Sequence, residues 1–189
     1  GMRWVPFAVL MAAVALLVSS AEASAVPKKA PWATVNVCDT AKKRNSVGIR
    51  AGMPGNGTDQ RMYMRFQLQW FDTAKRRYVD IGPPSTWIRA GSARRLKLAQ
   101  RGFTFGGIED PPAGARFKFR GHVSFQWRAL RKVRRGAGRG RVREVVVRRA
   151  ARVTRGRLRG VRGGKPPRRS DAVCVVEGPA VPPAEQPAS

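Results

Sequence analysis

Few side chains in this sequence are placed to perform catalysis. His122 is the only histidine, and neither an acid nor a nucleophile stands beside it. The acidic residues are scattered, and only Glu109 and Asp110 are adjacent. The sequence has no Gly-rich phosphate loop and no nucleophile elbow. We therefore predict a non-enzymatic protein, although carboxylates from distant loops could still meet in the folded chain.

The strongest chemical signal is positive charge. The chain carries 38 Lys and Arg against 11 Asp and Glu, a net charge of +27 at pH 7. Residues 128–169 hold 18 of these bases and a single acid, Glu144. Charge of this density attracts anionic polymers. The predicted contact residues are Arg128, Arg131, Lys132, Arg134, Arg135, Arg139, Arg141, Arg143, Arg148, Arg152, Arg155 and Arg157. GC-rich codon usage is the alternative explanation, because the chain is also rich in Ala, Gly, Pro and Val.

The N-terminal segment has the features of a secretion signal. Arg3 precedes an apolar run over residues 4–18, and Ala23 and Ala25 have the spacing of a signal peptidase site. Fifteen apolar residues are too few to span a bilayer comfortably. We predict that residues 1–25 are a cleaved signal helix, that Gly1 is a cloning remnant, and that the mature protein is secreted without a membrane span.

Export changes what the two cysteines are expected to do. Cys38 and Cys174 lie in apolar runs near opposite ends of the folded region, "TVNVCDT" and "AVCVVEG". An oxidising compartment favours a disulfide between them over two free thiols. Closing so long a loop stabilises a protein by about 5 kcal/mol on the chain-entropy model. With one histidine and two distant cysteines, we predict no metal site and no cofactor.

The elements that must position these groups are predicted to be strands. In residues 61–72, "RMYMRFQLQWFD", apolar and polar residues alternate over nine positions, which indicates a strand. The pair Asn56-Gly57 supplies the turn before it. A second alternation over residues 117–129 divides a core face from a polar face that includes His122.

The basic run after this strand allows two interpretations. A helical stripe could form from Val142, Val145, Val146 and Val153. The run "VREVVV" is β-branched, however, and follows a strand and a Gly-rich loop, which favours a β-hairpin. In that register Val145, Val147, Ala151 and Val153 would face inward, with Arg149 among them. The Gly- and Pro-rich segment after Thr154 is expected to be a flexible loop until "AVCVV" resumes the sheet.

One stretch resembles a known family. "DPPAGARFKFRGHVSF" is similar to the part of fibronectin type III and related immunoglobulin-like domains in which Pro and Gly precede an aromatic residue that opens a long strand. In that family the aromatic residue is usually a tyrosine whose hydroxyl bonds back to the chain. This sequence has Phe117 there, so that bond cannot form. The resemblance implies an all-β fold, a two-sheet antiparallel β-sandwich with a long basic hairpin.

Length and composition indicate one domain, because 189 residues with 42% apolar content can build one core. We predict a linker at residues 26–33, a single sandwich domain at residues 34–178 and a Pro/Ala-rich disordered tail at residues 179–189.

Three classes of function remain open. The favoured one is a secreted binding or structural module that engages an anionic cell-envelope or extracellular polymer, or a protein partner, through the basic hairpin. The second is an extracellular nucleic-acid binder acting by electrostatics, since no aromatic residue follows Trp127 to stack on bases. The third is an unrecognised hydrolase.

Overall fold

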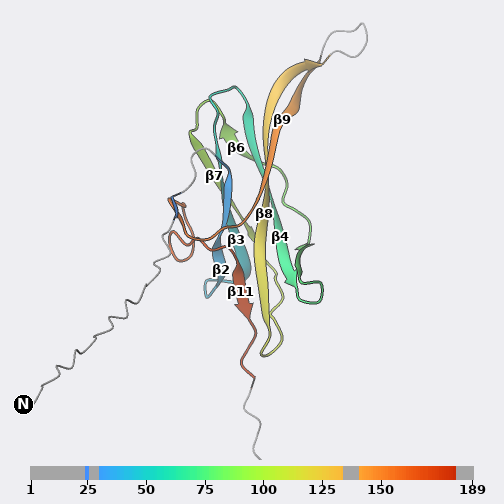
Figure 1. Cartoon of the computed structure of the whole chain (residues 1–189), viewed down its shortest axis with the longest axis vertical. Coiled ribbons are helices and arrows are strands. Elements are labelled where there is room, and N and C mark those ends of the chain that lie inside the picture. The colour runs from blue at the N-terminus through green and yellow to red at the C-terminus, as the bar shows by residue number, and fades with distance from the viewer. Residues whose placement is uncertain (1–23, 26–29, 134–140, 182–189) are drawn as a thin grey trace, which may run out of the picture.

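The structure, a computed structural model, describes residues 24–25, 30–133 and 141–181. All regular structure in these residues is β-strand, arranged in two main sheets, which confirms the all-β prediction and is consistent with a β-sandwich (Figure 1). Within the same ranges, no helix is long and apolar enough to cross a membrane. Residues 1–23, which hold most of the predicted signal peptide, lie outside the described ranges.

The smaller sheet has three antiparallel strands in the order β2-β3-β7. They are β2 (Trp32–Thr40), β3 (Lys43–Pro54) and β7 (Leu98–Phe105). β2 begins two residues before the predicted start of the domain at residue 34, and Trp32 and Ala33 are buried. The centre strand β3 is buried from Ser46 to Pro54 except at Arg50, which is half-buried.

The larger sheet has six strands but is only four strands wide. Its members are β4 (Arg61–Asp72), β5 (Arg77–Ile81), β6 (Ile88–Ser92), β8 (Arg116–Val133), β9 (Arg141–Val153) and β11 (Cys174–Glu177). β4 and β8 pair at the centre, β5 and β6 both pair with β4, and β9 and β11 both pair with β8. Separately, β1 (Ser24–Ala25) pairs in parallel with β10 (Leu158–Arg159).

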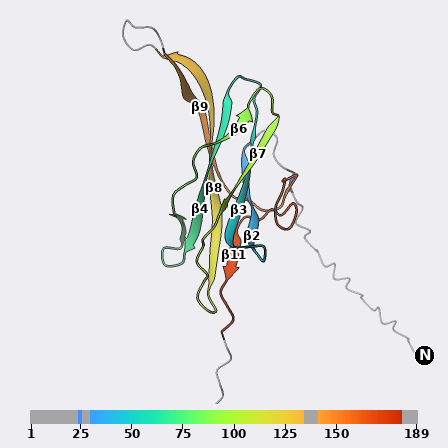
Figure 2. The same ribbon diagram turned by 180° about the vertical axis from the view of Figure 1, so that it is seen from behind.

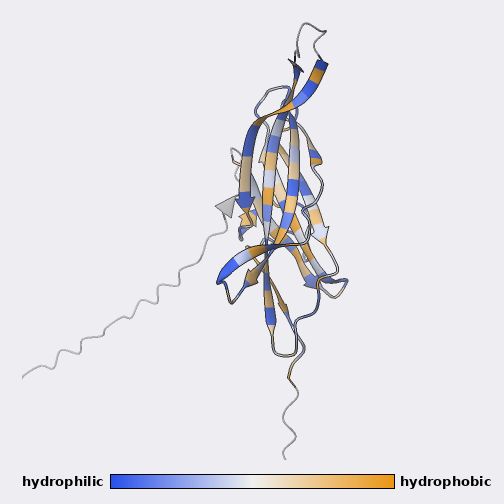
Figure 3. Cartoon of the chain, turned by 90° about the vertical axis from the view of Figure 1, so that its right-hand side faces the viewer, coloured by the Kyte–Doolittle hydropathy of each residue, from blue (hydrophilic) through white to orange (hydrophobic). Residues whose placement is uncertain are grey.

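The core lies between the inner faces of the two sheets. Met62, Met64 and Phe66 of β4 and Val123 and Phe125 of β8 are essentially inaccessible to solvent. Figure 3 shows the polar and apolar bands that alternate along the strands. This pattern confirms the predicted strand over residues 61–72 and, as far as Trp127, the predicted core face of residues 117–129.

Trp127 ties the larger sheet to the smaller one. Its ring is fully buried, and its indole N–H donates a hydrogen bond of 3.2 Å to the backbone oxygen of Pro54 on β3. A buried indole N–H needs such a partner, because leaving it unpaired would cost free energy.

The basic run forms a hairpin, since β8 and β9 are antiparallel and paired from His122–Val153 to Val133–Arg141. The predicted inward face of β9 is wrong from Val147 onward, since Val147, Ala151 and Val153 are exposed, whereas Val145 is half-buried opposite Ala129. A β-bulge between Trp127 and Arg128 leaves Val147 without a partner, so the register shifts by one residue. Ala150 is therefore the β9 residue that packs against the core, while Val147 and Val153 are exposed.

Beyond Arg128 the hairpin leaves the sandwich. β4 pairs with β8 only as far as Arg128, so residues 129–133 and 141–145 pair only with each other. These residues are called the arm, and Figures 1 and 2 show it extending past one end of the sandwich. Its Leu130 and Val142 are 55% and 53% exposed.

The segment after β9 is not the detached loop that its composition suggests. It follows the outer edge of β2, where Val35 and Asp171 exchange two backbone hydrogen bonds of 2.9 Å. The backbone N–H groups of Arg155 and Lys165 also donate to β2, to Ala33 and Asn36 at 2.8 Å each. The segment thus covers an edge that would otherwise be free to pair with other chains.

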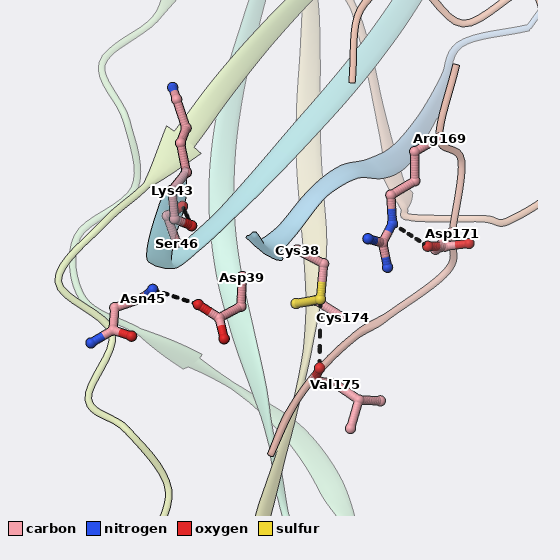
Figure 4. Close-up of a disulfide and its surroundings, with 9 residues drawn as sticks. All are labelled: Cys38, Asp39, Lys43, Asn45, Ser46, Arg169, Asp171, Cys174 and Val175. Atoms are coloured by element: carbon pink, nitrogen blue, oxygen red, sulfur yellow. Dashed lines mark hydrogen bonds and ion pairs between the residues drawn. A yellow bond between two sulfur atoms is a disulfide. The ribbon is translucent and has the colours of Figure 1, made fainter. Parts of the chain in front are cut away.

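The predicted disulfide between Cys38 and Cys174 is present, with Cα atoms 5.3 Å apart across a sequence separation of 136 residues (Figure 4). Cys38 lies on β2 and Cys174 on β11, so the bond joins the two sheets directly. Next to it, the N–H of Asn45 donates to the Asp39 carboxylate at 2.6 Å, which fixes the turn between β2 and β3. A disulfide is compatible with an extracellular protein.

Replacing both cysteines, as C38S/C174S, should lower the free energy of unfolding by about 5 kcal/mol, because the unfolded chain gains the freedom of a very long loop. Urea unfolding of the double variant and of the parent, each without reductant, measures this. A loss below about 1 kcal/mol would show that the bond contributes little. The parent treated with a reductant should unfold like the variant.

Candidate functional site

The structure divides the predicted basic residues between two sides of the hairpin. Arg128 and Lys132 lie on its outer side, the side away from the core, where they pair across the ladder with Val146 and Val142. The other side carries Arg131, Arg141, Arg143, Arg148 and Arg152. Arg155 and Arg157 follow β9 and are exposed, whereas Arg134, Arg135 and Arg139 lie outside the described residues. These bases therefore do not form one surface.

The arm carries several basic side chains and few acidic ones that could neutralise them. Arg131 and Arg143 are exposed and stand directly opposite each other in the ladder. Like charges opposite each other destabilise a strand pair. At the base of the arm, Arg148 places its guanidinium 4.5 Å from the centre of the Trp127 ring. That contact fixes one arginine against the sandwich and leaves those further out exposed.

A second positive surface lies on the outer face of the larger sheet. There Arg128 lies over Tyr63 at 4.1 Å from the ring centre and over Trp87 at 5.2 Å. Arg65 approaches the same Trp87 ring, at 5.0 Å. Tyr63 and Arg65 come from the polar positions of β4, Arg128 from β8, and Trp87 from the residue just before β6.

A third stacked arginine lies further along the same face. Arg120 of β8 lies over the Tyr78 ring of β5 at 3.9 Å. Its Nε donates a 2.7 Å hydrogen bond to Gln69, whose amide donates to Asp80 at 2.7 Å. We call Arg65, Arg120 and Arg128, with the rings of Trp87, Tyr78 and Tyr63, the arginine row. Arg120 and Arg128 are eight residues apart on one strand, a span of about 27 Å.

Glu144 anchors one end of the arginine row. Its carboxylate accepts hydrogen bonds from the Tyr63 hydroxyl at 3.0 Å and from Arg61 and Arg128 at 3.3 Å each. Partial burial acts to raise the pKa of Glu144, but the hydrogen bonds from Tyr63, Arg128 and Arg61 outweigh it and hold that pKa below its usual range. Glu144 is thus ionised and fixes Arg128 above Tyr63.

Sequence reasoning identified Arg128 but missed the rest of the arginine row. Arg65 and Arg120 could have been predicted from the sequence, because both occupy polar positions of strands in which apolar and polar residues clearly alternate. Trp87 and Tyr78 could not have been predicted, because they lie on strands or loops whose pairing partners the sequence does not reveal. No aromatic residue follows Trp127 along the chain, but rings of earlier residues lie against Arg128 and Arg148 in space.

Among the described residues, groups with possible catalytic roles do not converge around His122 or in the largest apolar-lined cleft. His122 lies on the outer face between Gln67 of β4 and Val153 of β9, neither of which is an acid or a base. An apolar cleft of about 780 Å³ opens between the sheets, lined by rings that include Trp70, Phe103 and Phe117. The titratable group in its lining is Glu109 alone, so this cleft offers no pair of carboxylates.

In the part of the chain that the structure describes, no group of three or more His, Cys, Asp or Glu side chains is placed to hold a metal ion. Comparison with family models, with curated proteins and with solved structures finds no match for this chain.

Removing the Glu144 carboxylate, as E144Q, should destabilise the protein by about 1–3 kcal/mol at pH 7, because two arginines lose an ionised acceptor. The folded pKa of Glu144 is lowered, so its contribution is complete above the unfolded value of about 4.3 and is lost as the pH falls through the lower folded value. The stability difference between parent and variant should therefore be constant near pH 7 and shrink below about pH 4.

Urea unfolding of both proteins from pH 3 to pH 7 measures that difference. E109Q is the control, since it also removes one carboxylate charge, in a different part of the fold. A difference that did not vary with pH would show that the Glu144 charge contributes nothing to stability.

Proposed function

We propose that this protein is a secreted, non-enzymatic binding module that holds an anionic extracellular or cell-envelope polymer along the arginine row. The observation that carries the proposal is the stacking of three guanidinium groups on three aromatic rings across one sheet face. Polymers of this class carry carboxylate, sulfate or phosphate groups at regular intervals, and these are the groups that arginine binds in bidentate fashion.

Stacking prepares an arginine for such a ligand. A guanidinium that lies flat on a ring is held by its face, which leaves N–H groups at its edge free to bind an oxyanion. Because the ring already restricts the side chain, less conformational entropy is lost when the anion binds. Arg120 and Arg128 each use Nε in a bond to a glutamine, which restricts them further.

The length of the arginine row favours a polymer over a small anion. A span of about 27 Å can engage several charged units of one chain at once. The arm continues in the same direction from Arg128 and adds Lys132 on the same side. Positive potential from the arm raises the rate at which a polyanion meets this surface.

Among anionic polymers, an acidic polysaccharide fits better than a nucleic acid. Binding of single-stranded nucleic acid relies on bases that stack on aromatic side chains. In the arginine row each ring already carries a guanidinium, so a base would have to displace it. Export, proposed from the N-terminal sequence and consistent with the disulfide, also argues against chromosomal or messenger nucleic acid as the partner.

The frame of this module is proposed to be immunoglobulin-like. The order β2-β3-β7 corresponds to strands A, B and E of that fold, and the order of β9, β8, β4 and β5 corresponds to G, F, C and C′. β8 then takes the place of the strand that Phe117 was predicted to open. With this assignment the arginine row lies on the outer face of the sheet that contains β9, β8, β4 and β5.

The double variant R65Q/R120Q should bind heparin at least about ten-fold more weakly than the parent, because two preformed oxyanion contacts are lost. Neither arginine contacts Glu144, so the fold should persist. Calorimetric titration at moderate salt measures the affinity, and a thermal melt of each protein checks the fold. R44Q/R95Q is the matched control, since it removes two exposed arginines outside the arginine row.

The control pair should lose less than about three-fold in affinity. Equal losses in the two double variants would show that only net charge matters and would contradict the proposed site. Duplex and single-stranded DNA are titrated in parallel. Tighter binding of DNA than of heparin at the same salt concentration would favour the nucleic-acid alternative instead.

A further inference from the structure

Arg50 occupies an unusual position on the smaller sheet, remote from the arginine row. It lies at the centre of β3, between Thr34 of β2 and Gly102 of β7. Its neighbours Ile49 and Ala51 are completely buried in the core, so Arg50 projects from the opposite, outer face of the sheet. A charged side chain at the centre of a sheet is expected to reach open solvent or an acid.

The Arg50 guanidinium instead lies in a space bounded by two glycines. A Cβ atom at Gly163 would lie 2.7 Å from one of its terminal nitrogens, and a Cβ at Gly102 would lie 3.4 Å from its central carbon. Gly163 belongs to the segment that covers β2, and Gly102 belongs to β7. A side chain at Gly163 would crowd the guanidinium, whereas one at Gly102 would only come into contact with it, so Gly163 is the glycine that makes room for it.

Within this space the Arg50 cation lacks a partner. Its Nε is buried and has no hydrogen-bond acceptor among the described residues. The ion pairs found in the same part of the chain do not include it. Burial, and then repulsion by Arg101, lowers the pKa of Arg50 from its usual value. An arginine remains charged in proteins, so this arrangement costs free energy unless an anion compensates it.

A cavity of about 290 Å³ adjoins the Arg50 side chain. Its lining includes two further bases, Lys43 at the start of β3 and Lys165 in the covering segment, together with the polar side chains of Asn36 and Thr104. Three cations from two separate parts of the chain, β3 and the covering segment, thus line one small cavity, and none of its lining residues is acidic.

We propose that this cavity is a binding site for a tetrahedral oxyanion, a phosphate or sulfate group. Arg50 would bind it through the edge of its guanidinium, and Lys43 and Lys165 would supply charge from the sides. A doubly charged group matches a site with three cations. The volume lies at the lower end of the range for ligand pockets, which favours a small group over a peptide or an extended chain. The site is independent of the arginine row on the other sheet.

The test compares the thermal midpoint of the disulfide-bonded protein in phosphate, in sulfate and in chloride at equal ionic strength. Phosphate and sulfate should raise the midpoint in a saturable way, because they bind the folded state, and chloride should not. In R50M the anion should bind at least about ten-fold more weakly. In R95M, which removes an exposed arginine elsewhere, the affinity should stay within two-fold of the parent.

A second variant, K43Q/K165Q, keeps Arg50 and should weaken binding several-fold, so the proposal remains testable even if R50M does not fold. A parent protein whose midpoint is the same in all three salts would overturn the proposal. Retention of parental affinity in R50M or in K43Q/K165Q would also overturn it. R65Q/R120Q should respond like the parent, and loss of the response there would place the anion on the arginine row instead.

A further titration distinguishes whether the site binds the free phosphate ion or a phosphate ester. Glycerol 3-phosphate carries the same dianionic group on an organic chain. Binding at least as tight as that of inorganic phosphate would indicate that the site accepts a phosphate ester, whereas binding more than about ten-fold weaker would assign it to the free ion. R50M should abolish whichever response is found.

Discussion

The pairing of β4 with β8 is the constraint on which the rest of the structure depends. Ten consecutive residue pairs, from Arg61–Arg128 to Trp70–Phe119, fix the two strands side by side at the centre of the larger sheet. Because side chains alternate, the same ladder that aligns the core rings on one face aligns the arginines on the other. The disulfide then holds the smaller sheet against this ladder through β11 and β2. The core and the proposed binding face are therefore the two faces of one pair of hydrogen-bonded strands.

The basic side chains lie in different physical environments in different parts of the molecule. On the arm the positive charge is exposed and partly self-repelling, as at Arg131 and Arg143, which suits long-range attraction. On the outer face it is held over rings and balanced at one end by Glu144, which suits contact with a ligand. At Arg50 it is half-buried and has no compensating acid among the described residues, which suits a single small anion. Codon usage can explain how many arginines the chain has, but it does not place three of them over aromatic rings.

The sequence predicts the strands well where alternation is unbroken, as in β4 and the first part of β8, and the disulfide follows from two cysteines in apolar runs. It fails at Val147, because one unpaired residue reverses the inward face of β9 without altering the valine pattern. It also could not reveal that Trp87 lies under two arginines, or that Gly163 borders Arg50, since both contacts join distant segments. Cross-strand register decides such contacts, and register depends on the whole fold.

The most direct test of the proposed binding face is an NMR titration of the disulfide-bonded protein with a short acidic oligosaccharide, observed at the arginine Nε–H groups. Unlike an affinity measurement, it reports where the ligand lies. Signals of Arg65, Arg120 and Arg128 should shift together and saturate at one ligand concentration, because one chain spans the arginine row. Shifts confined to the arm, at Arg131, Arg141 and Arg143, or no saturable shift at all, would contradict the assignment of the binding site to this face.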